Sequence, residues 1–253
     1  MYKVNNFFNN NDVNKVDEKG AFSIAEYKRD LSVDHSTAVS EYFASKMNIH
    51  RRQLVCDLSK SDVTVQAGTM QWMIGDASAT TGVKGVGDFL KKSVGSKVTG
   101  ESTIKPEYVG DGMVVLEPTY KHILLEDLAD WNGSVVLDDG LFLACHNTAK
   151  FKVISRTNLS SAVLGNEGLF NLSITGDGIV ALESNCPREE LIEIYLEEDV
   201  VKIDGNMAIA WSSSLKFTVE RSGKTLVGSA TSKEGLVNVY RGTGKILMAP
   251  VAR

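Results

Sequence analysis

Short hydrophobic runs, separated by Gly, Asp and Asn, dominate the chain from residue 53 onward. The clearest runs cover residues 135–137, 141–143, 151–154, 192–195 and 215–219. The last three alternate hydrophobic and polar side chains, as strands do when one face is buried and the other faces water. Residues 22–27 alternate in the same way. Short strands with turn residues between them, at a spacing of roughly eight to twelve residues, predict an all-β sandwich or barrel.

Near the N-terminus the hydrophobic spacing changes from that of a strand to that of a helix. Four hydrophobic residues recur at helical spacing: Val39, Tyr42, Phe43 and Met47. Asp34 or Ser36 can cap the start of this segment, because a short polar side chain accepts hydrogen bonds from the first N–H groups of a helix. We therefore predict one helix over residues 36–47, with its hydrophobic stripe facing the core.

Three segments of nearly the same sequence lie 66 residues apart, at residues 108–118, 174–184 and 240–250. Each contains a Gly-x-Gly triplet followed by a short hydrophobic run. We interpret the triplet as a turn that leads into a strand. A fixed period of this length indicates one supersecondary unit that is used three times.

Glycines also mark a second position of the repeat, upstream of each triplet: Gly68, Gly140 and Gly205. The dipeptides Asp139-Gly140 and Asp204-Gly205 predict β-hairpins with type I′ turns. Such a turn needs positive φ, which glycine adopts without steric cost.

These observations divide the chain into an N-terminal strand and helix at 1–52 and three β repeats at 53–121, 122–187 and 190–253. No Pro- or Ser-rich linker separates the repeats, so we expect them to pack as one body. Stacked units of this kind share a core that one unit could not form alone. The predicted fold is therefore all-β, with three tandem β-sandwich repeats and one N-terminal helix.

Composition narrows the range of functions. The chain has 253 residues and a formal net charge of −5. A nucleic-acid-binding protein usually has the opposite charge, so we expect no nucleic-acid partner. No hydrophobic run is long enough for a signal peptide or a membrane span, and we expect a cytoplasmic location. The three cysteines, Cys56, Cys145 and Cys186, include no Cys-x-x-Cys pair, which favours free thiols in a reducing compartment.

Motifs that carry chemistry are weak in this sequence. Gly223-Lys224-Thr225 looks like the end of a P-loop, but Thr218 stands where that motif requires glycine. None of the four histidines pairs with another at metal-ligand spacing. Cys145 and His146 are adjacent, and a strand would point them to opposite faces. We assign no catalytic residue, cofactor or metal ligand, although residues distant in sequence could still converge on a site.

The first repeat contains about five extra residues, and the segment 82–101 within it is locally basic although the whole chain is acidic. Hydrophobic residues at helical spacing lie beside two lysines there, and we predict an interaction surface formed by Val86, Phe89, Leu90, Lys91 and Lys92. Neighbouring basic and apolar groups suit a protein partner or an anionic membrane surface. The alternative is a surface loop folded back on its own domain.

Several motifs together resemble one known family. They are residues 68–75, Gly100-Glu101-Ser102, the three Gly-x-Gly strands and the Ala249-Pro250 ending. This combination resembles the altered inheritance of mitochondria 24 family, over nearly the whole chain from about residue 22. The resemblance implies a fold like that of the trp RNA-binding attenuation protein, with three units per chain. It also implies that chains close into a ring, with a trimer expected, and it implies no established enzymatic activity.

The leading interpretation is a non-enzymatic scaffold or interaction protein that acts as a homo-oligomeric ring. A small-molecule- or RNA-binding module is the first alternative, and it rests on likeness of fold alone. The ligand and RNA sites of the attenuation protein do not carry over, because no Lys/Arg pattern recurs across the three repeats. The second alternative is an enzyme with a site between repeats.

Overall fold

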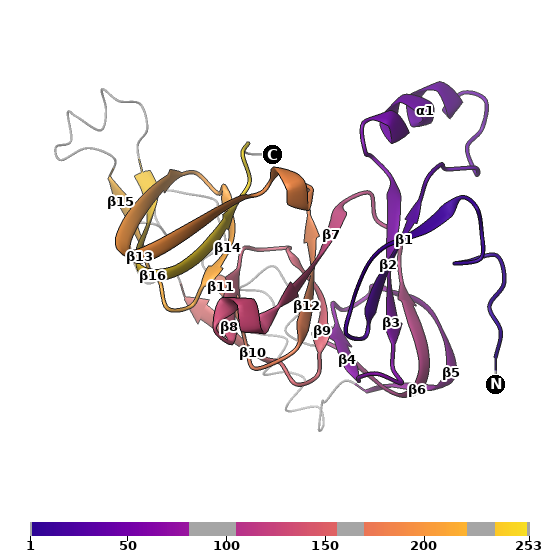
Figure 1. Ribbon diagram of the computed structural model, residues 1–253, viewed down its shortest axis with the longest axis horizontal. Helices are drawn as coiled ribbons and strands as arrows, with labels where there is room; N and C mark the ends of the chain where they lie inside the picture. Colours follow the sequence, from indigo (N-terminus) through magenta and orange to yellow (C-terminus); the bar gives the residue numbers. More distant parts are fainter. Residues whose placement is uncertain (1, 81–104, 156–169, 222–235, 252–253) are drawn as a thin grey trace.

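The computed structural model describes residues 2–80, 105–155, 170–221 and 236–251. Within them, strands make up two large sheets, and the single α-helix is α1 (Ala38–Lys46) (Figure 1). Two short 3₁₀ helices, η1 (Leu128–Trp131) and η2 (Arg188–Glu190), lie between strands. The prediction of an all-β fold with one N-terminal helix is confirmed.

The larger sheet has nine strands in the order β1-β2-β3-β6-β4-β9-β12-β7, and β5 pairs with β6. These strands are β1 (Val13–Lys19), β2 (Phe22–Tyr27), β3 (Arg51–Asp57), β4 (Val63–Val65), β5 (Met70–Thr80), β6 (Glu107–Leu116), β7 (His122–Asp127), β9 (Phe142–His146) and β12 (Ile179–Ser184). The second sheet has seven strands in the order β10-β11-β8-β14-β16-β13, and β15 pairs with β16. They are β8 (Ser134–Leu137), β10 (Lys150–Ser155), β11 (Phe170–Thr175), β13 (Ile192–Asp204), β14 (Ala208–Ser212), β15 (Lys216–Arg221) and β16 (Leu236–Met248).

Strand pairing recurs at the spacing of the sequence repeat. Three residues that lie 66 positions apart have equivalent partners: Tyr108 pairs with Val63, Ile174 with Val135, and Tyr240 with Val201. Six residues further along the chain, three more pairs follow the same rule: Val114 with Cys56, Val180 with Glu126, and Ile246 with Ile194. The backbone thus forms one pairing pattern three times, and the repeat boundaries given above stay predictions.

Each copy of the pairing pattern forms one group of strands. Two short strand pairs join successive groups. β4 pairs with β9, and β8 pairs with β14, each over three residue pairs and each antiparallel. The side chains at these junctions enter the core. Val63 and Ala144 belong to one buried hydrophobic cluster, and Val136 and Trp211 belong to another. Because removing apolar surface from water is the main driving force of folding, these shared clusters hold neighbouring groups together.

The Gly-x-Gly triplets are not simple turns, contrary to our interpretation. Gly110 lies inside the continuous strand β6, and Gly242 lies inside β16. Gly176 lies between β11 and β12, where the chain passes from one sheet to the other. At Gly110 the φ angle is 117°, and an added Cβ would collide with the carbonyl oxygen of Asp76. Glycine is therefore needed where the strand bends and its neighbour on one side changes, rather than where it reverses.

The prediction of two Asp-Gly β-hairpins is also wrong. Gly140 and Gly205 do adopt positive φ, at 73° and 58°, but the aspartates before them do not, so neither turn is type I′. Asp139-Gly140 connects β8 to β9, which lie in different sheets. Asp204-Gly205 connects β13 to β14, which both pair with β16 and not with each other. A positive-φ glycine fits a crossing between sheets as well as a hairpin, so the dipeptide alone could not distinguish them.

Candidate interaction surface

Helix α1 lies in the connection between β2 and β3, and local hydrogen bonds fix both of its ends. The carboxylate of Asp34 accepts hydrogen bonds from the N–H groups of Ser36 and Thr37, at 2.7 and 3.2 Å. At the other end, the N–H groups of Met47 and Ile49 donate to the carbonyl of Ala44. The prediction of a helix in this segment is therefore confirmed, and the helix is one turn shorter than residues 36–47. The predicted cap is wrong: Thr37 is the N-cap residue and makes no side-chain capping hydrogen bond, while Asp34 binds the turn just before the helix.

Arg52 ties the end of this connection to the sheet. Its side chain is only 4% exposed, and it forms an ion pair with Glu26 at 2.8 Å. The same guanidinium donates to the carbonyl and to the side-chain oxygen of Asn48, at 3.2 and 3.0 Å. Asn48 has positive φ, which asparagine tolerates better than most residues. The helix thus projects from a fixed base.

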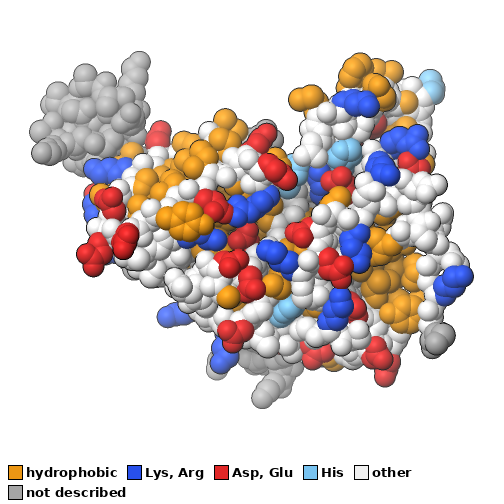
Figure 2. Space-filling model, in the orientation of Figure 1, with side chains coloured by type: hydrophobic (Ala, Val, Ile, Leu, Met, Phe, Trp, Pro, Cys, Tyr) orange, Lys and Arg blue, Asp and Glu red, His pale blue; other side chains and the backbone are white. Residues whose placement is uncertain are grey.

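The hydrophobic stripe of α1 faces solvent, so our expectation that it faces the core is wrong. No residue of α1 is buried. Val39, Tyr42 and Phe43 are 66%, 58% and 62% exposed, and Met47, just after the helix, is 76% exposed. Figure 2 shows hydrophobic side chains gathered on this projecting part of the molecule, above β1, β2 and β3 in Figure 1. Helical spacing identifies a hydrophobic face, but it does not say what covers that face.

Apolar residues next to the helix enlarge this surface. Leu31 before the helix and Ile49 after it are 65% and 48% exposed. The rings of Tyr42 and Phe43 are in edge-to-face contact, with centroids 5.5 Å apart. We call the set Leu31, Val39, Tyr42, Phe43, Met47 and Ile49 the α1 surface. Contiguous exposed apolar patches are unusual on soluble proteins and mark interaction sites.

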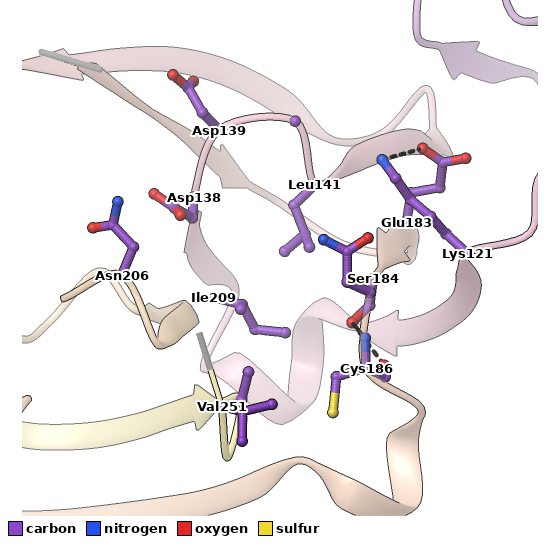
Figure 3. Close-up of a pocket in the computed structure, with 13 residues that line it drawn as sticks. Lys121, Asp138, Asp139, Leu141, Glu183, Ser184, Cys186, Asn206, Ile209 and Val251 are labelled. Carbon is purple, nitrogen blue, oxygen red and sulfur yellow. Dashed lines mark hydrogen bonds and ion pairs between the residues drawn. The ribbon is translucent and has the colours of Figure 1, made fainter. Parts of the chain in front are cut away.

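A pocket of about 310 Å³ lies elsewhere, where the ends of β8, β12 and β13 meet the C-terminal segment (Figure 3). Lys121 and Glu183 form an ion pair at 3.2 Å on one side of it, and Asp138 and Asp139 lie on the opposite side. Charged groups therefore lie on two sides of the pocket, and Leu141, Ile209 and Val251 add apolar lining. A pocket of this size and polarity suits a small polar molecule better than an apolar one.

The serine hydroxyl of the pocket is not arranged as a nucleophile. Ser184 Oγ donates to the carbonyl of Cys186 at 2.7 Å and accepts from the N–H of Cys186 at 3.0 Å. Cys186 Sγ lies 3.8 Å from a carboxylate oxygen of Glu190. A nucleophile needs an adjacent base or a lowered pKa. Here the serine hydroxyl is used to hold a local turn.

Cys145 and His146 point to opposite sides of β9, as predicted. Cys145 is fully buried in a hydrophobic cluster, whereas the His146 ring lies 5.1 Å from that of Phe22. Burial raises the pKa of the Cys145 thiol far above its usual range. Burial lowers the pKa of His146, whose Nε2 accepts a hydrogen bond from the N–H of Ala21. This geometry excludes a Cys145–His146 nucleophilic pair, and it gives His146 a structural role between β9 and the β1–β2 hairpin.

The remaining candidate chemistry concerns the cysteines, metal ligands and the basic segment. All three cysteines are free and buried. Across residues 2–80, 105–155, 170–221 and 236–251, no group of three His, Cys, Asp or Glu side chains lies close enough to hold a metal ion. The predicted surface formed by Val86, Phe89, Leu90, Lys91 and Lys92 lies outside the described residues. Lys105, four residues after the basic segment 82–101, lies over the Phe142 ring at 4.2 Å.

Comparison with known proteins identifies the family. The family described as Mitochondrial biogenesis AIM24 matches residues 47–251. An uncharacterized protein of Streptococcus pyogenes serotype M6 is 30% identical over 192 residues, which cover 73% of this chain and 75% of that protein. The crystal structure of a Streptococcus pyogenes protein aligns with a TM-score of 0.58 and 26% identity, over 81% of this chain and 90% of that one. The chain therefore belongs to the AIM24 family.

Membership of this family agrees with the resemblance noted in the sequence, and it brings no established activity with it. In the described part of the chain, no helix has the length and apolar character needed to cross a membrane.

Proposed function

We propose that the protein is a non-enzymatic scaffold that assembles as a homo-oligomeric ring, with a trimer as the expected size, and presents its α1 surface to a protein partner. The observation that carries the proposal is the exposure of every large apolar side chain on α1. A helix that contributed only to folding would bury its hydrophobic stripe, because that burial supplies most of the stability of a protein helix.

A protein groove is the occupant that fits α1 best. Val39, Tyr42 and Phe43 follow the i, i+3 and i+4 spacing by which amphipathic helices anchor in apolar grooves, and Met47 lies just after the helix. A helix that lies on an anionic membrane is rich in Lys and Arg on its polar face. The described helix has one acidic and one basic residue, Glu41 and Lys46, so its charge does not favour that alternative.

Three further parts of the proposal have separate support. The basic segment with Val86, Phe89, Leu90, Lys91 and Lys92 stays a proposed second contact surface, supported by its sequence alone. A cytoplasmic location is supported by the three free, buried cysteines, which suit a reducing compartment. The net charge of −5 supports the absence of a nucleic-acid partner.

Small-molecule binding is the alternative that a specific observation favours, namely the pocket beside Lys121 and Glu183. Mass spectrometry of the natively purified protein would detect a co-purifying metabolite. If Glu183→Gln loses such a metabolite and α1 variants retain it, the pocket is the functional site.

The α1 proposal is tested by photo-crosslinking from the helix in cells. A photoreactive residue at position 43 should capture one protein, and Phe43→Ser with Met47→Ser should remove that protein from affinity purifications. Tyr195→Ser is the matched control, because Tyr195 is an equally exposed aromatic residue on β13, at 69%. The proposal is overturned if both variants bind the same proteins as the wild type, or if α1 instead confers binding to anionic vesicles in a flotation assay.

A further inference from the structure

Six of the described strands pair with only one other strand, namely β1, β5, β7, β10, β13 and β15, and two of these matter here. Among the described strands, β5 pairs only with β6, and β13 pairs only with β16. In Figure 1 these strands lie at opposite ends of the molecule, β5 at the right and β13 at the left. An unpaired edge presents free N–H and C=O groups, and proteins cover such edges or use them for pairing.

These two edges are equivalent to the edges that form the internal junctions. By the repeated register, Val201 on β13 corresponds to Val63 on β4 and Val135 on β8. By the same rule, β5 corresponds to β9 and β14, because Val114 pairs with Met73, Val180 with Cys145, and Ile246 with Trp211. The chain thus forms the junction twice internally, and it has one half of a third junction at each end.

The internal junctions specify the register of that third junction. At the first, Thr64 pairs with Cys145, and at the second, Val136 pairs with Trp211. The equivalent residues at the open edges are Lys202 on β13 and Met73 on β5. Lys202 would therefore lie opposite Met73. Because the pairing is antiparallel, Val201 would lie opposite Ile74 and Ile203 opposite Trp72.

Side chains on the open edges of β5 and β13 are more exposed than the equivalent side chains at the two internal junctions. Cys145 and Trp211 are 0% and 3% exposed at the internal junctions, whereas the equivalent Met73 is 41% exposed. Val63 and Val135 are buried, whereas Val201 is half-buried. Apolar side chains thus occupy positions at the open edges that the internal junctions cover.

We propose that β13 of one copy pairs antiparallel with β5 of a second copy of this chain, with Val201 opposite Ile74, Lys202 opposite Met73 and Ile203 opposite Trp72. The proposal rests on the self-assembly proposed above and names its interface. The contact is between different surfaces of the two copies, so successive chains continue the internal series of junctions. Such head-to-tail contacts generate a ring when the rotation closes.

β13 has two features that can hinder pairing with another strand, a register shift and an exposed lysine. Neither conflicts with the proposed register. The register shift in β13 lies between Leu196 and Asp199, outside the three proposed pairs. Lys202 is exposed on the open edge, where lysine discourages unspecific strand addition. In the proposed pair its aliphatic part can lie along Met73 while its ammonium group stays in water.

Disulfide trapping tests the register on the full chain. Residues opposite each other in an antiparallel pair have Cα atoms about 4.5 to 5.5 Å apart, within disulfide reach. The double variant Lys202→Cys with Met73→Cys should give covalent oligomers under mild oxidation, and a reducing agent should remove them. Either single variant should give none. The control double variant Lys202→Cys with Asp76→Cys should also give no covalent oligomers. Asp76 lies three residues from Met73 on β5, which is about 10 Å along a strand.

All substituted positions are exposed, so the variants should melt at the wild-type temperature. Light scattering on the same samples separates the two proposals. An oligomer without cross-linking of the double variant overturns this register and leaves self-assembly standing. A monomer overturns both.

Discussion

The ammonium group of Lys245 lies 4.0 Å from the centre of the Trp131 ring. Glu126 joins the pair: Trp131 Nε1 donates to a Glu126 carboxylate oxygen at 3.1 Å, and Lys245 Nζ lies 3.9 Å from the same oxygen. All three side chains are buried. A compensated charge therefore connects β16 near the C-terminus to β7 and η1 in the middle of the chain.

Removing Lys245 should be costly, because it leaves the carboxylate of Glu126 buried with weaker compensation. Arg188 Nε lies 3.6 Å from the other carboxylate oxygen of Glu126 and stays as a partner. We therefore expect Lys245→Ala to lower the free energy of unfolding by about 2–3 kcal/mol, less than for a buried carboxylate left with no cationic partner. Arg241→Ala is the matched control on the same strand, because its ion pair with Glu220 at 2.7 Å is largely exposed. The control should cost less than about 1 kcal/mol. Equal losses in urea denaturation would show that the buried cluster has no special role.

The exposed helix and the core should respond differently to the same substitution. Phe22 is fully buried, and Phe22→Ala should cost about 3–5 kcal/mol. Phe43 on α1 is mostly exposed, and Phe43→Ala should change stability by less than about 0.5 kcal/mol. Thermal and urea denaturation of both variants provide the measurement. A large loss for Phe43→Ala would mean that α1 is covered in the folded protein.

The bend at the first Gly-x-Gly triplet should tolerate no side chain. Gly110 combines positive φ with a backbone oxygen where a Cβ would lie, whereas Gly140 has positive φ with open space around it. Gly140→Ala should therefore cost about 1 kcal/mol of conformational strain. Gly110→Ala should cost clearly more, because β5 and β6 must also move apart. If Gly110→Ala is no worse than Gly140→Ala, the close approach of the two strands does not constrain this position.

Stability should fall as the pH is lowered below about 6.5, the ordinary pKa of histidine. Burial lowers the pKa of His146, so the unfolded chain binds a proton below that pH while the folded chain does not. Proton uptake by the unfolded state alone reduces stability as the pH falls. Burial also lowers the pKa of His122, which acts in the same direction. Denaturation midpoints between pH 7.5 and 5.5 should decrease, and less steeply in His146→Gln. An unchanged slope in that variant would contradict this, and exposed His35→Gln is the control.

The sequence predicted the strands well, because the alternation of hydrophobic and polar residues is a local feature. The 66-residue spacing locates Tyr108, Ile174 and Tyr240, and the structure gives them equivalent partners. What the glycines do there was not predictable. A glycine at positive φ can reverse a strand, bend it or pass it to another sheet, and long-range pairing decides which occurs.

The α1 surface shows a different limit. Its residues were identified from their spacing, but they were assigned to the core, since a hydrophobic stripe usually packs inward. Leu31 and Ile49 offered a signal in the other direction: apolar residues in the loops on both sides of a short helix enlarge its apolar area beyond what one packed face needs. The residues of the predicted basic surface, 86 and 89–92, lie outside the described structure and stay a prediction.

The central claim is that the chain functions as an assembly, and its native mass tests this most directly. One chain has a mass of 27.5 kDa. Multi-angle light scattering on the purified full chain at micromolar concentration should give a whole multiple of this mass, with three chains expected. The Lys202→Cys/Met73→Cys variant should keep that mass under denaturing, non-reducing conditions once oxidised. A single species of 27.5 kDa across the accessible concentration range would contradict the account.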